Sequence, residues 1–306
     1  TGRDDLTGRR VIVTGANSGL GLESVRALAR AGAVVVLAVR DPARGAAAVE
    51  RLAAEGIGDR LTVARLDLAD LTSVREFAAA QVVAGPLDIL MNNAGLMLVP
   101  KRELTSDGFE LQMGVNHLGH FALTALLLPA LQQATAARVV SLSSIAAGLT
   151  GPLDPRLGVA GRYAAFTAYA QSKLACALFG FELDRRLKAA GSSVTSVVAH
   201  PGYVATALFT RQQHPSLSDR LTSWVTPVVG SRPAHGARSQ LRAATDRTLT
   251  GGEFIGPALV VRGRPVRQRP PGNALDRASA SLLWDLSATM TETDFPEPLL
   301  TTESGT

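Results

Sequence analysis

The stretch TGANSGLG, residues 14–21, follows directly on the apolar run VIV and places three glycines where a strand turns into a helix. Gly15 would permit a tight exit from the strand, Gly19 a close approach to the backbone, and Gly21 close packing of helix on strand. A helix that begins at Gly19 or Leu20 points unpaired N–H groups and its positive dipole end outward, which suits a phosphate. The stretch predicts a phosphate-binding turn, although its G-x-x-x-G-x-G spacing is not the commoner dinucleotide fingerprint and a plain turn also fits it.

Beyond this turn, apolar runs alternate with amphipathic, alanine-rich segments. The runs predict strands at Arg10–Val13, Val34–Val39, Leu61–Leu66, Asp88–Met91, Arg138–Leu142, Val194–Ala199 and Ala258–Val261. The amphipathic segments predict helices near Leu20–Ala31, Ala43–Glu55, Leu71–Val83, Phe109–Gln133, Thr167–Ala190 and Ala234–Ala244. The alternation predicts an α/β fold, a doubly wound parallel sheet of the Rossmann type flanked by helices and formed by a single domain over residues 1–306.

Three segments interrupt the alternation. Residues 148–162 form an irregular insertion after the fifth strand. Residues 207–233 are expected to cover the substrate, because ligands in such sheets bind beyond the carboxyl ends of the strands. Residues 265–306 are expected to form a proline-rich connection and a C-terminal tail, with one apolar helix near Leu282–Met290.

Composition narrows the classes of partner. The chain has 306 residues, is 46% hydrophobic and carries a net charge of +5 from scattered arginines, while aromatic residues make up only 5%. Nucleic-acid binding would need a basic face interleaved with aromatics, so it is not expected. No apolar run reaches the length of about 18 residues that suggests a membrane-spanning helix, so no integral span is expected. A single cysteine fits a reducing cytoplasm, the predicted location.

Polar residues follow the ends of several predicted strands. The second strand is followed by Arg40, while Val39 stands where an acid would bind the ribose diol of NAD and repel a 2′-phosphate. A guanidinium suits a phosphate by its charge and planar fork, so NADP is the predicted cofactor. Residues 67–68 (Asp-Leu) and 92–95 (Asn-Asn-Ala-Gly) are expected to line an adenine and ribose groove.

Tyr169 and Lys173 lie four residues apart at the start of a predicted helix and therefore share a face. A neighbouring ammonium favours the phenolate, so the tyrosine could act as an acid or base near neutral pH. Ser144, at the end of the fifth strand, could hold a substrate oxygen. Tyr163 has no lysine four residues later and is not expected to be the acid. His117, His120 and His200 lack a convincing third ligand, and no metal is expected.

Taken together, TGANSGLG, NNAG, a mid-helix Asn116, Ser144, the YxxxK pair and HPGYVAT stand in the order typical of the short-chain dehydrogenase/reductase family. The chain resembles this family over Arg9–Thr206. Within it, VTGANSGLG, NHLGHFALT and AYAQSKLA are similar to the branch that contains retinol dehydrogenases and the WW-domain oxidoreductase. The long interval of 24 residues between Ser144 and Tyr169 also fits that branch.

The resemblance implies a role for each matching residue. Tyr169 would be the proton donor, Lys173 would bind the nicotinamide ribose, Ser144 would orient the carbonyl, and Asn116 would anchor a water in a proton relay. Besides the tyrosine and lysine, the residues expected to bind NADP are Gly15, Asn17, Ser18, Gly19, Leu20, Gly21, Arg40, Asp67, Leu68, Asn93, Ala94, Gly95, Pro201, Gly202, Val204 and Thr206. The first of these would surround the pyrophosphate, and the last four would close over the nicotinamide.

The resemblance therefore implies an NADP-dependent carbonyl reductase or alcohol dehydrogenase with a small-molecule substrate. Leu149, Met97, Pro152 and Phe209 are candidates for a lipophilic pocket. One alternative is a dinucleotide-binding regulator without catalysis, although such proteins commonly lose the tyrosine or lysine. Another is a sugar-nucleotide epimerase or dehydratase, whose glycines usually follow a G-x-x-G-x-x-G spacing.

Two predicted helices, Phe109–Gln133 and Thr167–Ala190, carry more apolar residues than one stripe facing the sheet would need. Phe121 and Phe179 belong to this surplus. Large exposed apolar patches usually mark contacts, so a homodimer through these helices is expected, unless the C-terminal tail covers the same surface.

Overall fold

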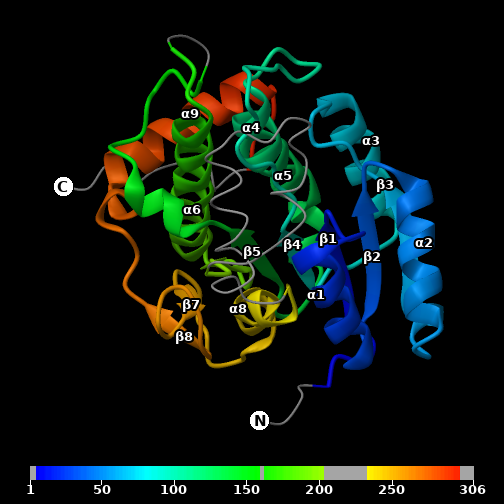
Figure 1. Ribbon diagram of the computed structural model, residues 1–306. Coiled ribbons are helices and arrows are strands. Elements are labelled where there is room, and N and C mark those ends of the chain that lie inside the picture. The colour runs from blue at the N-terminus through cyan, green and yellow to red at the C-terminus, as the bar shows by residue number, and fades with distance from the viewer. Residues whose placement is uncertain (1–4, 159–161, 203–232, 297–306) are drawn as a thin grey trace, which may run out of the picture.

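The computed structural model describes residues 5–158, 162–202 and 233–296 (Figure 1). Strands in these ranges form one sheet in the order β3-β2-β1-β4-β5-β6-β7-β8. The strands are β1 (Arg10–Thr14), β2 (Val34–Val39), β3 (Leu61–Arg65), β4 (Ile89–Asn92), β5 (Arg138–Leu142), β6 (Thr195–Ala199), β7 (Phe254–Pro257) and β8 (Pro265–Gln268). Strands β1 to β7 pair in parallel, and β8 pairs antiparallel to β7. The predicted doubly wound α/β fold is confirmed.

Helices cover both faces of the sheet. On one face lie α1 (Gly19–Arg30), α2 (Pro42–Ala53) and α8 (Pro233–Thr245). On the other lie α3 (Leu71–Val83), α5 (Gly119–Gln132), α6 (Ala165–Ala189) and α9 (Arg277–Thr291). This arrangement explains the continuous apolar run in β1: Ile12 is buried in one core, and Val11 and Val13 are buried in the other.

The prediction of a strand at Ala258–Val261 is wrong. These residues form the turn between β7 and β8, where the amide of Leu259 donates to the carbonyl of Arg262 at 3.0 Å. Val260 has φ of 63°, in the left-handed region that β-branched residues seldom adopt. The stretch therefore has the composition of a strand but not the extended backbone conformation of one. The predicted proline-rich connection instead begins with β8, an edge strand, where Pro265 is tolerated because few ladder bonds are needed.

The predicted helix Phe109–Gln133 consists of α4 (Leu111–Met113), a π-helical turn η2 (Gly114–Leu118) and α5. The asparagine that disfavours a regular helix, Asn116, lies within the π turn. The stretch Leu111–Gln132 is, among the described residues, long and apolar enough to cross a membrane, with a mean hydropathy of 1.2. Since 89% of its apolar 18-residue window is buried inside the protein, it has the surroundings of a core helix.

The apolar surplus on α5 and α6 lies beneath the C-terminal helix α9 (Figure 1). The ring of Phe121 lies 5.4 Å from Trp284 and 5.3 Å from Phe295, and Phe179 packs against the same cluster. Phe121 and Phe179 are 0% and 3% exposed. The expectation that these side chains form an exposed dimer face is therefore wrong. The C-terminal tail covers them instead, so their apolar surface is removed from water within the chain itself.

Candidate active site

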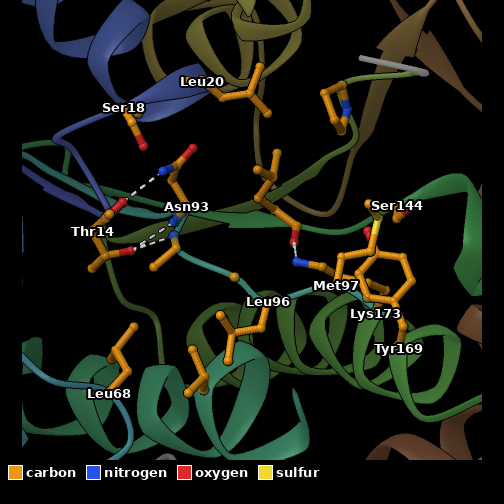
Figure 2. Close-up of a pocket in the computed structure, with 18 of the residues that line it drawn as sticks. Thr14, Ser18, Leu20, Leu68, Asn93, Leu96, Met97, Ser144, Tyr169 and Lys173 are labelled. Carbon is orange, nitrogen blue, oxygen red and sulfur yellow. Dashed lines mark hydrogen bonds between the residues drawn. The ribbon is translucent and has the colours of Figure 1, made fainter. Parts of the chain in front are cut away.

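A cavity of about 480 Å³ opens at the carboxyl ends of β1, β2, β4 and β5. The residues predicted to bind the cofactor or to act in catalysis, where they fall in the described ranges, line it except Asn116. Asn92, predicted for the adenine and ribose groove, does not line it either. Figure 2 shows Thr14, Ser18 and Asn93 at one end, called here the glycine end. Ser144, Tyr169 and Lys173 lie at the other, called here the tyrosine end. The fold thus brings residues separated by more than half the chain into one site.

The glycine end has the backbone that a close-approaching ligand needs. Gly15 and Gly19 have φ of 65° and 54°, and a Cβ on Gly15 would lie 3.0 Å from Ala94. A Cβ on Gly21 would lie 2.5 Å from the carbonyl oxygen of Gly15. Ser18 is the N-cap of α1, but its side chain makes no capping hydrogen bond. The first N–H groups of α1 are therefore left to a ligand, and the end fits a pyrophosphate.

A buried network holds this backbone in place. The Thr14 hydroxyl accepts hydrogen bonds from the amides of Asn93 and Ala94, both at 2.9 Å. Asn93 in turn donates to the Thr14 carbonyl at 2.7 Å, as Figure 2 shows. Gln240 of α8 donates to the Asn93 side chain at 3.0 Å and to Ser24 of α1 at 2.7 Å. Strand, loop and helices are thus locked together, and the turn is preorganised.

Arg40 lies exposed at the end of β2 and lines the cavity, while Val39 is buried. The next residue, Asp41, is the N-cap of α2 and accepts from the amides of Ala43 and Arg44 at 3.0 and 3.2 Å. Its carboxylate also lies 3.3 Å from the Arg44 guanidinium. The acid is therefore occupied as a cap, and Arg40 is left facing the cavity. Asp67 and Leu68 line the same side, after β3.

At the tyrosine end, the two serines of SLSS have different surroundings. The Ser143 hydroxyl is buried and donates to the Lys173 carbonyl at 2.7 Å. The Ser144 hydroxyl accepts from the amide of Ala146 at 3.2 Å, which leaves its hydrogen free to donate into the cavity. The Ser144 hydroxyl is thus the one with a hydrogen available to a substrate, and that role stays a prediction.

Tyr169 and Lys173 project from the first turns of α6 into the cavity. The Lys173 ammonium donates to the carbonyl of Leu142 at 2.9 Å and is held at the end of β5 (Figure 2). A Cβ on Gly95 would lie 3.3 Å from this ammonium, so the absence of a side chain at Gly95 leaves room for it. Tyr163 lies elsewhere: its hydroxyl donates to the Val99 carbonyl at 2.6 Å. Burial raises the pKa of Tyr163 to about 12, which does not suit an acid near neutral pH.

Asn116 lies behind the cavity wall and is 2% exposed. Its side chain accepts from the Leu96 amide at 2.7 Å and donates to the Leu96 carbonyl at 2.9 Å, which fixes the loop after β4. Its own carbonyl accepts from His120 Nδ1 at 3.0 Å and from Cys176 Sγ at 3.1 Å. Asn116 therefore joins two segments: its side chain holds the loop after β4, and its carbonyl bonds Cys176 of α6. A water relay at this residue stays a prediction.

Two buried histidines follow Asn116 in NHLGH. Burial, aided by the charge of Lys173, lowers the pKa of His120 to about 4, so its ring is neutral. Nδ1 then donates to Asn116, and Nε2 accepts from the Thr14 hydroxyl at 2.9 Å. Burial lowers the pKa of His117 to about 3, and its Nε2 bonds Ser287 of α9 at 2.7 Å. The first histidine thus links Thr14 at the glycine end to the carbonyl of Asn116, and the second anchors α9.

Pro201 and Gly202, after β6, line the cavity. They lie toward the tyrosine end, because the Ser143 amide donates to the carbonyl of Ala199 at the end of β6 at 2.8 Å. Val204 and Thr206, together with Phe209 and residues 207–232, lie outside the described residues. Sequence reasoning missed Thr14, Arg44, Gln240 and the structural roles of the histidines. Arg44 had a signal, since it is a second arginine close to Arg40 in the sequence. Gln240 had none, because only the tertiary fold brings α8 to the glycine turn.

Comparisons with known proteins agree with this geometry. The family model for the short chain dehydrogenase matches residues 9–216. A polyprenol dehydrogenase of Mus musculus is 42% identical over 292 residues, which cover 90% of this chain and 82% of that protein. Retinol dehydrogenase 12 of Mus musculus is 38% identical, with 92% of this chain and 86% of that protein covered.

Solved structures give the same result. An uncharacterized protein from Mycobacterium paratuberculosis is 42% identical, with a TM-score of 0.79 and coverage of 96% of this chain and 97% of that chain. The RhlG/NADP active-site complex of Pseudomonas aeruginosa is 26% identical, with a TM-score of 0.64 and coverage of 82% and 95%. From its glycine turn to its tyrosine–lysine pair, the chain belongs to the short-chain dehydrogenase/reductase family of dinucleotide-dependent oxidoreductases, in a branch like that of the retinol dehydrogenases.

Proposed function

We propose that the protein is an NADP(H)-dependent oxidoreductase that interconverts a lipophilic carbonyl compound and its alcohol, with Tyr169 as the general acid and base. The observation that carries this proposal is the convergence of Ser144, Tyr169 and Lys173 on the same cavity as the glycine turn. The nicotinamide of NADPH supplies the hydride when bound.

The residues of the tyrosine end divide the remaining work. In reduction, the Tyr169 hydroxyl donates its proton to the substrate oxygen as negative charge develops there. The Ser144 hydroxyl, whose hydrogen is free, donates a hydrogen bond to the same oxygen and orients it. The Lys173 ammonium, held by the Leu142 carbonyl in the same cavity, would bind the nicotinamide ribose.

Preference for NADP over NAD is proposed from the charges at the end of β2. Arg40 faces the cavity at the end of β2, and Arg44, in the first turn of α2, lines it as well. The acid that stands nearby, Asp41, caps α2 through two backbone amides and is engaged with Arg44. A 2′-phosphate would thus meet guanidinium groups, which bind phosphate in a planar fork. The RhlG relative was solved with NADP, which supports the same preference.

A lipophilic substrate is proposed from the walls of the tyrosine end. Leu149 and Phe166 line the cavity and are 69% and 48% exposed. Met97 and Ile145 line it as well. Apolar side chains that remain in water at a cavity mouth usually mark contact with an apolar ligand. The relatives named as polyprenol and retinol dehydrogenases support this substrate class. Pro152, predicted to join these residues, does not line the cavity.

The alternative of a non-catalytic regulator has less support, because each group that the chemistry needs is present and faces the cavity. A cytoplasmic location stays a prediction that rests on the single cysteine.

The test is a panel of aldehydes, ketones and alcohols of increasing chain length, followed by the absorbance of NADPH and, in parallel, of NADH. We expect turnover with NADPH and a KM that falls as the apolar chain lengthens. Each buried methylene is worth about 0.8 kcal/mol, or roughly fourfold in KM. Absence of turnover across the panel with either cofactor, in protein that binds NADPH, would favour the regulator instead.

A further inference from the structure

His200 stands between the end of β6 and the turn Pro201–Gly202, and it is 1% exposed. Its ring bonds in two directions. Nδ1 accepts from the Gly202 amide at 3.3 Å, and Nε2 lies 2.6 Å from Oε1 of Gln268 on β8. The ring therefore connects the turn that lines the tyrosine end to the last strand of the sheet.

The partners determine the proton positions on this ring. An amide N–H can only donate, so Nδ1 must be unprotonated and Nε2 must carry the hydrogen. Gln268 is oriented to match, because its own amide donates to the Pro257 carbonyl at 2.6 Å and turns Oε1 toward the ring. Burial lowers the pKa of His200, which keeps the ring neutral. The arrangement is a single tautomer with both nitrogens bonded.

The surrounding residues leave room for this ring and little else. The ring stacks on Phe254 of β7, with centroids 5.0 Å apart and planes inclined by 21°. A Cβ on Gly256 would overlap His200 Nε2 and Gln268 Oε1. The glycine in the middle of β7 is thus required by the ring rather than by its own backbone angles.

The turn itself is pressed against the β7–β8 hairpin. Gly202 has φ of 75°, and a Cβ there would lie 2.5 Å from the carbonyl oxygen of Val261. Pro201 and Gly202 line the same cavity as Tyr169 and Lys173. The position of this wall therefore depends on a strand some sixty residues later in the chain.

We propose that His200, held by Gln268, is a positioning residue that fixes the Pro201–Gly202 turn against the nicotinamide half of the cofactor. The inference rests on the proposed NADP-dependent function. The ring should therefore contribute to binding of the nicotinamide half. It should not contribute to binding of the adenosine half, which would meet Arg40 and the glycine end on the other side of the cavity.

The test compares two ligands, NADPH and adenosine 2′,5′-bisphosphate, which lacks the nicotinamide half. His200→Asn keeps an acceptor where Nδ1 stands, and His200→Gln keeps a donor where Nε2 stands. We expect His200→Gln to weaken NADPH binding by about tenfold and to raise the KM for NADPH, since it loses the bond to the turn. His200→Asn should lose less, and affinity for the bisphosphate should stay within about twofold in both.

Gln268→Leu gives a second route to the same loss, because it frees the ring without altering it. The exposed His235→Asn is the matched control and should change neither affinity. Equal weakening of both ligands in the His200 and Gln268 variants, or no change in NADPH binding, would overturn the inference. Failure of the wild type to bind either ligand would instead overturn the proposed function, and this inference with it.

Discussion

At the glycine end of the cavity the ligand would meet main-chain groups, whereas at the tyrosine end it would meet side chains. The glycine end is held by contacts among β1, α1, α8 and the loop after β4, with Asn93 bonded to both Thr14 and Gln240. At the tyrosine end, Ser144 and Tyr169 come from two elements, and Gly202 packs against the β7–β8 hairpin at Pro257 and Val261.

The difference shows how binding and chemistry are divided in this protein. Backbone donors at a helix N-terminus stabilise a phosphate equally before and during reaction, so they contribute to cofactor affinity. Side chains that meet charge developing on a substrate oxygen contribute to rate. Substitutions at the glycine end should therefore change affinity, and substitutions of Ser144 and Tyr169 should change turnover.

The largest expected effect at the glycine end is that of Gly21→Ala. The new Cβ would lie 2.5 Å from the Gly15 oxygen and 2.7 Å from Asn93 Nδ2, so the turn must shift. Overpacking of this kind costs about 1–3 kcal/mol, and NADPH affinity should fall at least about tenfold. Titration with NADPH measures the affinity, and melting curves measure the loss of stability. Gly272→Ala is the control, since a Cβ there meets nothing within 4 Å; equal behaviour of the two variants would contradict the close approach.

A smaller effect is expected at the end of β2. If Arg40 meets the 2′-phosphate, NADPH should bind about tenfold more tightly than NADH, a difference of about 1.4 kcal/mol. Arg40→Ala should remove most of that difference, and Arg44→Ala should remove less because its guanidinium already engages Asp41. Turnover at saturating NADPH should stay near that of the wild type. Equal affinities for NADPH and NADH in the wild type would show that Arg40 does not discriminate.

The sequence predicted the sheet, its first six strands and the lining of the cavity, because those features depend on local patterns. Glycines at Gly15 and Gly19 report a backbone requirement directly, and a buried parallel strand has a continuous apolar run. The failures lie where the outcome depends on contacts between distant segments. The run at Ala258–Val261 has the composition of a strand, yet it forms part of the turn that connects β7 to β8, which begins with Pro265.

The apolar surplus on α5 and α6 is the second failure. Composition shows that Phe121 and Phe179 need cover, but it does not distinguish another subunit from the chain's own tail. The structure supplies Trp284 and Phe295 as the cover. His200 is a third case, since its two partners are a main-chain amide and a residue 68 positions away.

The claim that the tyrosine end performs the chemistry has a direct test with a matched control in the chain itself. Tyr169→Phe and Tyr163→Phe each remove one hydroxyl, but only that of Tyr169 faces the cavity, while that of Tyr163 bonds the Val99 carbonyl. The measurement is turnover of a carbonyl substrate at saturating NADPH, with NADPH affinity determined on the same preparations. Tyr169→Phe should lose about 10²–10⁴-fold in turnover with affinity nearly unchanged, and Tyr163→Phe should keep at least about half of the wild-type rate. A Tyr169→Phe protein that retains about half of the wild-type turnover would contradict the account.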